Sequence, residues 1–281
     1  MAHTPASLLV VASAFSFQGG AALATTLFDR AGPVPVVWMR SAFGALVLLA
    51  LWPETLRRIT TGQLRWVVAL GLTLAAMNTC FYESIDRIPL GVAVTAEFVG
   101  PLTVAVLGSR RAVEFVWVAL AAAGVLLLGS PTVNVDHVGL AFALFAGVCW
   151  GTYIVVAKQV VGAWPLATGL TLSLAVAGLV LAPAALVVGY EKLASAPVLG
   201  LGLGVALLST VLPYLLELTA LRRLRVSTFG ILMSLEPAVA ALLGALALSQ
   251  RLSFAESVAV LLVILASIGA NRQTRTPPLE T

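Results

Sequence analysis

Five charged side chains interrupt long apolar stretches of the sequence: Arg40, Glu83, Glu97, Glu217 and Glu236. Each stretch is of the kind that spans a lipid bilayer. A charge held at that depth costs at least about 2.5–3.5 kcal/mol for Arg, so such residues usually face a cavity or a partner. Their presence favours a protein that moves a polar solute across a membrane.

Glu97 and Glu236 offer acid–base chemistry at depth. Pro101 has no N–H, so the carbonyl of Glu97 loses its helical partner, and Pro237 directly follows Glu236. Carboxylates in such water-poor places can exchange protons or bind an ammonium group. Arg40 stays charged and can hold a carboxylate through two parallel hydrogen bonds. Because a zwitterionic amino acid needs this combination, we predict that all three bind substrate and that the two glutamates couple transport to protons.

Polar or amphipathic side chains at span depth complete the predicted binding site: Gln18, Asn78, Tyr82, Trp150, Tyr153 and Tyr214. The same residue types also serve as hydrogen-bonding contacts between helices. No catalytic residue, cofactor or metal site is expected. The only histidines, His3 and His137, lie outside the apolar stretches, and two cysteines do not make a metal site.

Structural alternatives exist for each charge. Glu83 could pair with Arg87 one turn later, and Glu217 could extend toward Arg222 and Arg223. Arg40 could form an ion pair with a glutamate of a neighbouring helix. Glu97 and Glu236 could likewise be purely structural.

Membrane helices must position these residues. Hydrophobic residues make up 60% of the chain and charged residues 10%, with a mean hydropathy of +1.05, whereas a soluble domain carries roughly a quarter charged residues. A helix needs about 20 apolar residues to cross the hydrocarbon core. The sequence predicts an all-α polytopic membrane protein with ten transmembrane helices, over 6–28, 33–52, 64–86, 89–108, 112–129, 138–160, 166–188, 198–221, 225–247 and 253–271.

Basic residues predict the orientation. Ten spans place both termini on one side, together with Arg57, Arg58, Arg65, Arg110, Arg111, Lys158, Arg222, Arg223, Arg225, Arg272 and Arg275. The other side holds only Arg30, Arg87, Lys192 and Arg251. The positive-inside rule therefore predicts cytoplasmic termini. The net charge of +4 reflects this bias, and no folded soluble surface gathers basic residues for nucleic-acid binding.

The two halves of the chain resemble each other. A displacement of 136 residues aligns Asn78 with Tyr214 and Pro101 with Pro237. A repeat of five spans is odd, so the second copy must enter the membrane inverted, and transporters built this way bind substrate near the midplane between the halves. Helix rise puts Glu97 about 12 Å from the outer end of its span and Glu236 about 16 Å from the inner end of its own. We predict repeats over 1–130 and 131–271 and a disordered cytoplasmic tail over 272–281.

Segments in order along the chain carry a family resemblance: Ser16–Ala24, Met77–Asn78, Phe81–Tyr82, Ile88–Pro101, Ser109–Arg111, Phe115–Trp117, Cys149–Trp150, Ser209–Tyr214 and Thr228–Pro237. They resemble the EamA-domain branch of the drug/metabolite transporter superfamily, and more closely the bacterial threonine/homoserine exporters within it. The resemblance implies two EamA repeats, a bacterial inner-membrane location and efflux of small amino acids or related metabolites. Glu83 and Asp86 depart from it, since such exporters tend to have neutral residues there.

Together these features predict an exporter of threonine- or homoserine-like amino acids that works by alternating access and proton antiport. The expected partners are the small-molecule substrate, protons and the lipid bilayer, and a monomer is expected. A facilitator that ignores the proton gradient, or an exporter of a different small metabolite or drug, is the alternative. An enzyme is not expected, because a Ser–His pair or an aspartyl dyad cannot be built from residues within the spans.

Overall fold

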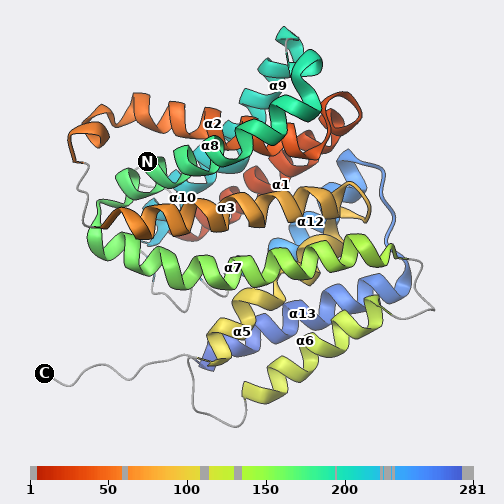
Figure 1. Cartoon of the computed structure of the whole chain (residues 1–281). Coiled ribbons are helices and arrows are strands. Elements are labelled where there is room, and N and C mark those ends of the chain that lie inside the picture. The colour runs from red at the N-terminus through yellow and green to blue at the C-terminus, as the bar shows by residue number, and fades with distance from the viewer. Residues whose placement is uncertain are drawn as a thin grey trace, which may run out of the picture.

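The computed structural model describes residues 5–58, 63–107, 114–129, 135–193, 195–221, 224, 229 and 232–273. Its described residues form helices and short connections (Figure 1): α1 (Ala6–Ala31), α2 (Pro33–Leu51), the short 3-10 helix η1 (Pro53–Arg58), α3 (Leu64–Ile85), α4 (Leu90–Glu97), α5 (Val99–Leu107), α6 (Glu114–Leu128), α7 (His137–Ala163), α8 (Leu166–Leu193), α9 (Ala196–Ala206), the π-helical turn η3 (Leu207–Val211), α10 (Leu212–Leu221), α12 (Glu236–Ala247) and α13 (Phe254–Gln273). Arg110, Arg111, Arg222, Arg223, Arg225, Arg275 and the tail after Gln273 lie outside the described residues.

The described helices match the predicted membrane segments in type and position. Six are long and apolar enough to cross a membrane: Ala6–Ala31, Pro33–Leu51, Leu64–Ile85, His137–Ala163, Ala167–Val188 and Ala196–Glu217. Four apolar helical segments are shorter: Leu90–Val104, Val116–Leu128, Glu236–Ala247 and Phe254–Gly269. The described part of the chain is therefore all-helical, and its apolar helices are those of a polytopic membrane protein.

Three predicted spans are interrupted. The span predicted over 89–108 is two helices, α4 and α5, that meet at Phe98. The span predicted over 198–221 contains the π-helical turn η3 between α9 and α10. In the span predicted over 225–247, the helix α12 begins at Glu236. In each case a proline that cannot donate a backbone hydrogen bond lies at or just after the break.

Helix ends outside the apolar stretches are set by local chemistry. The carboxylate of Asp136 accepts hydrogen bonds from the backbone N–H groups of Val138 (2.7 Å) and Gly139 (3.2 Å), which starts α7. At the start of α13, Ser253 and Glu256 bond reciprocally to each other's backbone N–H, which is a capping box. This pairing gives the buried Glu256 a structural role.

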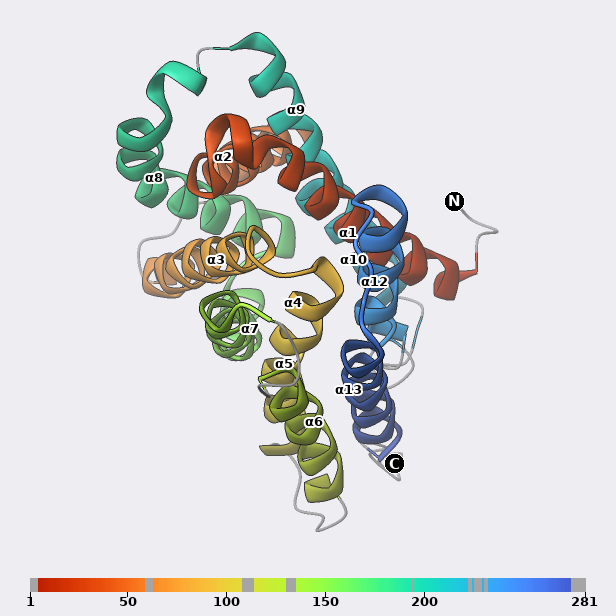
Figure 2. The ribbon, with the colours of Figure 1, turned by 90° about the vertical axis from the view of Figure 1, so that its right-hand side faces the viewer.

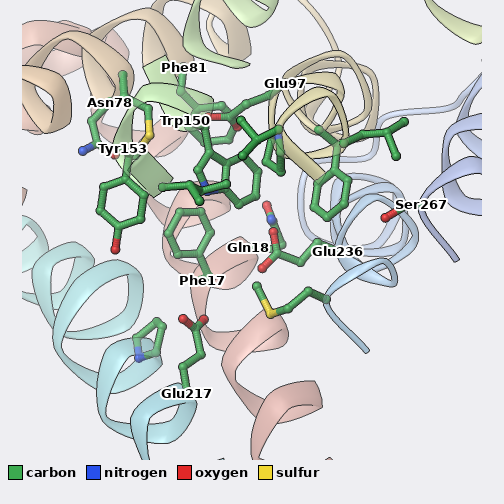
Figure 3. A pocket seen from close by; sticks show the side chains of 18 of the residues that line it. Phe17, Gln18, Asn78, Phe81, Glu97, Trp150, Tyr153, Glu217, Glu236 and Ser267 are labelled. Carbon is green, nitrogen blue, oxygen red and sulfur yellow. The ribbon is translucent and has the colours of Figure 1, made fainter. Parts of the chain in front are cut away.

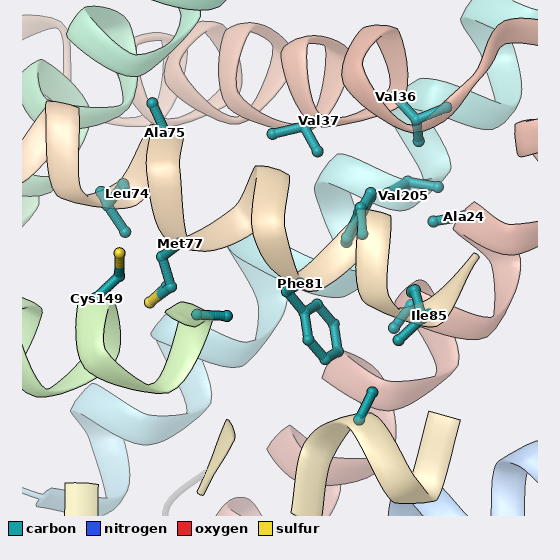
Figure 4. Packing of buried hydrophobic residues seen from close by; sticks show 14 of the residues in the cluster. Ala24, Val36, Val37, Leu74, Ala75, Met77, Phe81, Ile85, Cys149 and Val205 are labelled. Atoms are coloured by element: carbon teal, nitrogen blue, oxygen red, sulfur yellow. The ribbon is translucent and has the colours of Figure 1, made fainter. Parts of the chain in front are cut away.

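The core forms where α3 packs between other helices. Figure 4 shows Leu74, Ala75, Met77, Phe81 and Ile85 of α3 facing side chains of α1, α2, α7 and α9. Across the described helices, α2 packs on α8, α3 on α7, α6 on α13, α1 on α10, and α4 on α12. Figure 2 shows α6 and α13 side by side, apart from α2, α8 and α9. Each of these five pairs joins an early helix to a late one, so the site between them draws on both halves of the chain.

Candidate functional site

A cavity of about 510 Å³ lies between α1, α3, α4–α5, α7, α10, α13 and the residues before α12 (Figure 3). Its volume falls within the range of about 300–1,000 Å³ usual for small-molecule sites. Its described lining includes three carboxylates and no Lys or Arg. The lining residues are Phe17, Gln18, Met77, Asn78, Phe81, Glu97, Phe98, Pro101, Leu102, Val104, Trp150, Tyr153, Ile154, Pro213, Tyr214, Glu217, Phe229, Met233, Glu236 and Ser267.

Glu97 is the last residue of α4. It lines the cavity and is 6% exposed. Its backbone carbonyl cannot be bonded by Pro101 and lies against α7. A Cβ added at Gly147 would come within 2.6 Å of that carbonyl, and a Cβ at Gly100 would collide with the carbonyl of Gly147. Two glycines therefore permit the close approach of α7 to the α4–α5 break, which brings Trp150 to the cavity wall.

Glu236 is the first residue of α12. It lines the cavity and is 4% exposed. Neither its carboxylate nor that of Glu97 has a hydrogen-bonding partner within the described ranges. A buried charge without a partner is costly. These two side chains are therefore suited to hold a proton or a cationic ligand.

Glu217 is a third carboxylate in the same cavity. It accepts a hydrogen bond of 2.6 Å from the hydroxyl of Ser13 on α1, and it lines the cavity from α10. Arg222 and Arg223, the partners that the structural alternative offered for Glu217, lie outside the described residues.

The structure brings together most of the predicted neutral site residues. Gln18, Asn78, Trp150, Tyr153 and Tyr214 all line the cavity. The Asn78 side-chain amide donates 2.8 Å to the Leu74 carbonyl one turn earlier, so its oxygen is left for other contacts. Phe98 meets Trp150 edge-on, with ring centroids 5.2 Å apart.

Arg40 and Tyr82 are buried nearby but are not among the cavity-lining residues. The Nε of Arg40 donates to the Thr210 hydroxyl at 3.1 Å, and Nη2 donates to the Ser209 carbonyl at 3.0 Å. Pro213, four residues after Ser209, leaves that carbonyl without a helical donor. Within the described part of the chain Arg40 has no carboxylate within 4.0 Å; the one ion pair there joins Arg87 to Glu83 at 3.2 Å, as the structural alternative for Glu83 predicted.

Sequence reasoning missed the apolar walls of the cavity. Phe17, Phe81 and Phe98 each lie within three residues of a predicted site residue. The helical repeat, which places residues three or four apart on one face, could have added Phe81 beside Asn78. Phe17 and Phe98 give no such signal, because their approach to the cavity depends on the helix breaks and on tertiary packing.

Comparisons with known proteins agree with this architecture. A model of the EamA-like transporter family matches residues 137–272. The threonine/homoserine exporter RhtA of Escherichia coli (strain K12) is 42% identical over 274 residues, covering 96% of this chain and 92% of that protein. The chain belongs to the EamA-like transporter family. It is thus a transporter rather than an enzyme.

Two further comparisons extend the likeness along the chain. The threonine/homoserine exporter RhtA of Salmonella typhimurium (strain SL1344) is 41% identical over 277 residues, covering 98% of this chain and 93% of that protein. A protein crystal structure superposes with a TM-score of 0.62 at 18% identity, over 97% of this chain and 99% of that one. At that identity the superposition shows a shared fold.

Proposed function

We propose that this protein exports threonine, homoserine or similar small amino acids across the bacterial inner membrane by alternating access coupled to protons. The observation that carries the proposal is that Glu97 and Glu236, one from each half, line a single buried cavity. The identity of 42% to proteins named threonine/homoserine exporters supports the substrate class.

The proposed architecture is ten spans in two inverted repeats, residues 1–130 and 131–271. In this scheme α1, α2, α3, α4–α5 and α6 correspond to α7, α8, α9–α10, α12 and α13. Exchanging the halves leaves the packed pairs α2–α8, α4–α12 and α6–α13 unchanged and turns α3–α7 into α10–α1. This is the pattern that a two-fold axis in the membrane plane requires, so the packing supports the repeat.

In this proposal the substrate ammonium would meet Glu97 and Glu236 in the cavity, and its carboxylate would reach Arg40 beside the cavity. Gln18, Asn78, Tyr82, Trp150, Tyr153 and Tyr214 would complete the substrate-binding site. Since ammonium and proton compete for the same carboxylates, protons entering from the outer side would release the amino acid. One charge moving through 100 mV is worth about 2.3 kcal/mol, which would supply the drive.

The test is efflux from liposomes that contain the purified protein. Labelled threonine or homoserine is loaded, and efflux is compared with the proton gradient imposed in either direction or absent; empty liposomes give the background. We expect efflux to follow the gradient. Efflux that ignores the gradient would leave a facilitator, and no efflux of either amino acid from folded protein would remove the substrate assignment.

A further inference from the structure

Arg40 has an unused hydrogen-bond donor in the interior of the protein. Its guanidinium is held by Thr210 and the Ser209 carbonyl through Nε and Nη2, and the side chain is 3% exposed. The third nitrogen, Nη1, is buried and has no hydrogen-bond partner among the residues that the structure describes. Because an unsatisfied buried donor on a charged group is costly, its retention points to a ligand.

A second unused donor belongs to Tyr82, whose ring lies beside Arg40. Tyr82 faces the guanidinium of Arg40, with its ring centroid 5.6 Å from Cζ. Its side chain is fully buried, and its hydroxyl also lacks a partner within the described ranges. A guanidinium N–H and a phenolic O–H are both donors that a carboxylate accepts. The pair therefore suits the anionic end of an amino acid.

Phe17 contacts both Arg40 and the cavity. Its ring lies 4.9 Å from Arg40 Cζ, in cation–π contact, and it also lines the cavity that Arg40 does not reach. In Figure 3 the ring of Phe17 stands among the labelled cavity residues. One aromatic side chain therefore touches both the cation and the cavity that holds the three carboxylates.

We propose that Arg40 Nη1 and the Tyr82 hydroxyl form a carboxylate subsite that the Phe17 ring covers and the substrate uncovers. This inference rests on the proposed function and adds a reason why the site would prefer amino acids with a free carboxylate to amines. An amino acid with a free carboxylate displaces the ring and bonds to Arg40, while its ammonium reaches the glutamates. An amine without a carboxylate has no group to replace the ring's contact with the cation, so it binds more weakly.

The experiment measures binding of L-threonine and L-threoninamide to purified protein by isothermal titration calorimetry. Wild-type protein should bind threonine at least about tenfold more tightly, as loss of hydrogen bonds to a charged group implies. Tyr82→Phe, which removes only the hydroxyl, should weaken threonine binding severalfold and leave the amide unchanged. Arg40→Gln should abolish the preference; its folding is checked by its melting temperature.

The role of Phe17 has its own comparison. Phe17→Leu keeps an apolar side chain but removes the ring, so threonine should bind more tightly and the amide as before. Phe98→Leu is the matched control, because Phe98 lines the same cavity and makes no cation–π contact with Arg40 in the described structure; both ligands should change equally. If the two Leu variants behave alike, Phe17 does not cover the subsite.

Other outcomes separate the two levels of the proposal. Equal binding of threonine and threoninamide to wild-type protein would overturn the carboxylate subsite and leave amino-acid or amine transport standing. Binding of neither ligand to folded protein would remove the proposed substrate class, and the subsite with it.

Discussion

Glu97 is the residue at which proton coupling can be tested most directly. Glu97→Gln keeps the size of the side chain and removes its charge and exchangeable proton. We expect gradient-driven efflux in liposomes to fall to the gradient-independent level, while the melting temperature of the purified protein changes little, because the carboxylate makes no hydrogen bond within the described structure.

Glu83→Gln is the matched control for this change. Glu83 is an acid of α3 whose ion pair with Arg87 is partly exposed, and such pairs contribute little. The Glu83→Gln variant should therefore transport threonine or homoserine as the wild-type protein does. Unchanged pH-dependent efflux in Glu97→Gln would remove Glu97 from the coupling step.

Among individual residues, the sequence was most informative for those whose burial costs the most free energy. The deep charges and the polar residues at span depth stand out against an apolar background, and seven of the nine predicted binding residues line the cavity. The position of Arg40 behind Phe17 was not predictable, because it depends on a carbonyl freed at Ser209 by Pro213. A proline leaves the carbonyl four residues earlier without its helical donor, as was expected for Glu97 and Pro101. In the same way Pro213 would have identified the Ser209 carbonyl, but not the side chain that bonds to it.

We expect the contact between helices α4 and α12 to close one end of the cavity. A Cβ added at Gly91 would lie 2.8 Å from the Cα of Ala241. Beside it, the Leu90 backbone N–H donates 2.9 Å to the side-chain oxygen of Gln250. The cavity lies beyond this contact, toward α5 and the start of α12. If the termini are cytoplasmic, as the basic residues predict, this end is the outer one.

Gly91→Val should disturb this closed end. The nearest atoms are the Cα, Cβ and N of Ala241, which cannot shift without moving the backbone of α12, and overpacking of this kind costs about 1–3 kcal/mol. We expect liposome efflux to fall about tenfold or more, because one state of the alternating cycle becomes strained.

Gly200→Val is the matched control, since a Cβ at Gly200 in α9 meets no atom within 4 Å. Both variants place the same β-branched residue in a helix. Equal efflux from the two would mean that the α4–α12 contact does not take part in transport.

Helix type and position were largely predictable, whereas helix continuity was not. Apolar length identified each segment, but the break at Phe98 and the π-helical turn at Leu207–Val211 arise where prolines meet close interhelical packing. Gly100 and Gly147 show why: their lack of side chains matters only once α5 and α7 are in contact. Sequence periodicity contains no information about that contact.

Many apolar side chains of the described helices are exposed, which suits an integral membrane protein. Leu126, Leu179, Val187 and Leu246 are each more than 70% exposed, and lipid is the solvent that tolerates them.

Leu179→Arg, near the middle of α8, should cost about 2.5–3.5 kcal/mol on insertion and lower the yield of membrane-inserted protein. Val187→Arg, nearer the end of the apolar segment Ala167–Val188, should be tolerated because its side chain can reach the interface. Equal yields, measured by detergent extraction from membranes, would mean that this face is not in lipid.

The orientation of the whole molecule decides whether the proposed cycle is export, and α8 offers a direct test. Ala163 and Ala196 are exposed residues on either side of this one helix. Excess basic residues predict that Ala163 faces the cytoplasm and Ala196 the outside. In a background with Cys80 and Cys149 replaced by Ala, a membrane-impermeant maleimide should label Ala196→Cys in spheroplasts and Ala163→Cys only after permeabilisation. The reverse pattern would place the termini outside and make the α4–α12 contact an inner closure. The direction of transport would then be determined by the liposome data alone, because the bias of basic residues would no longer support export.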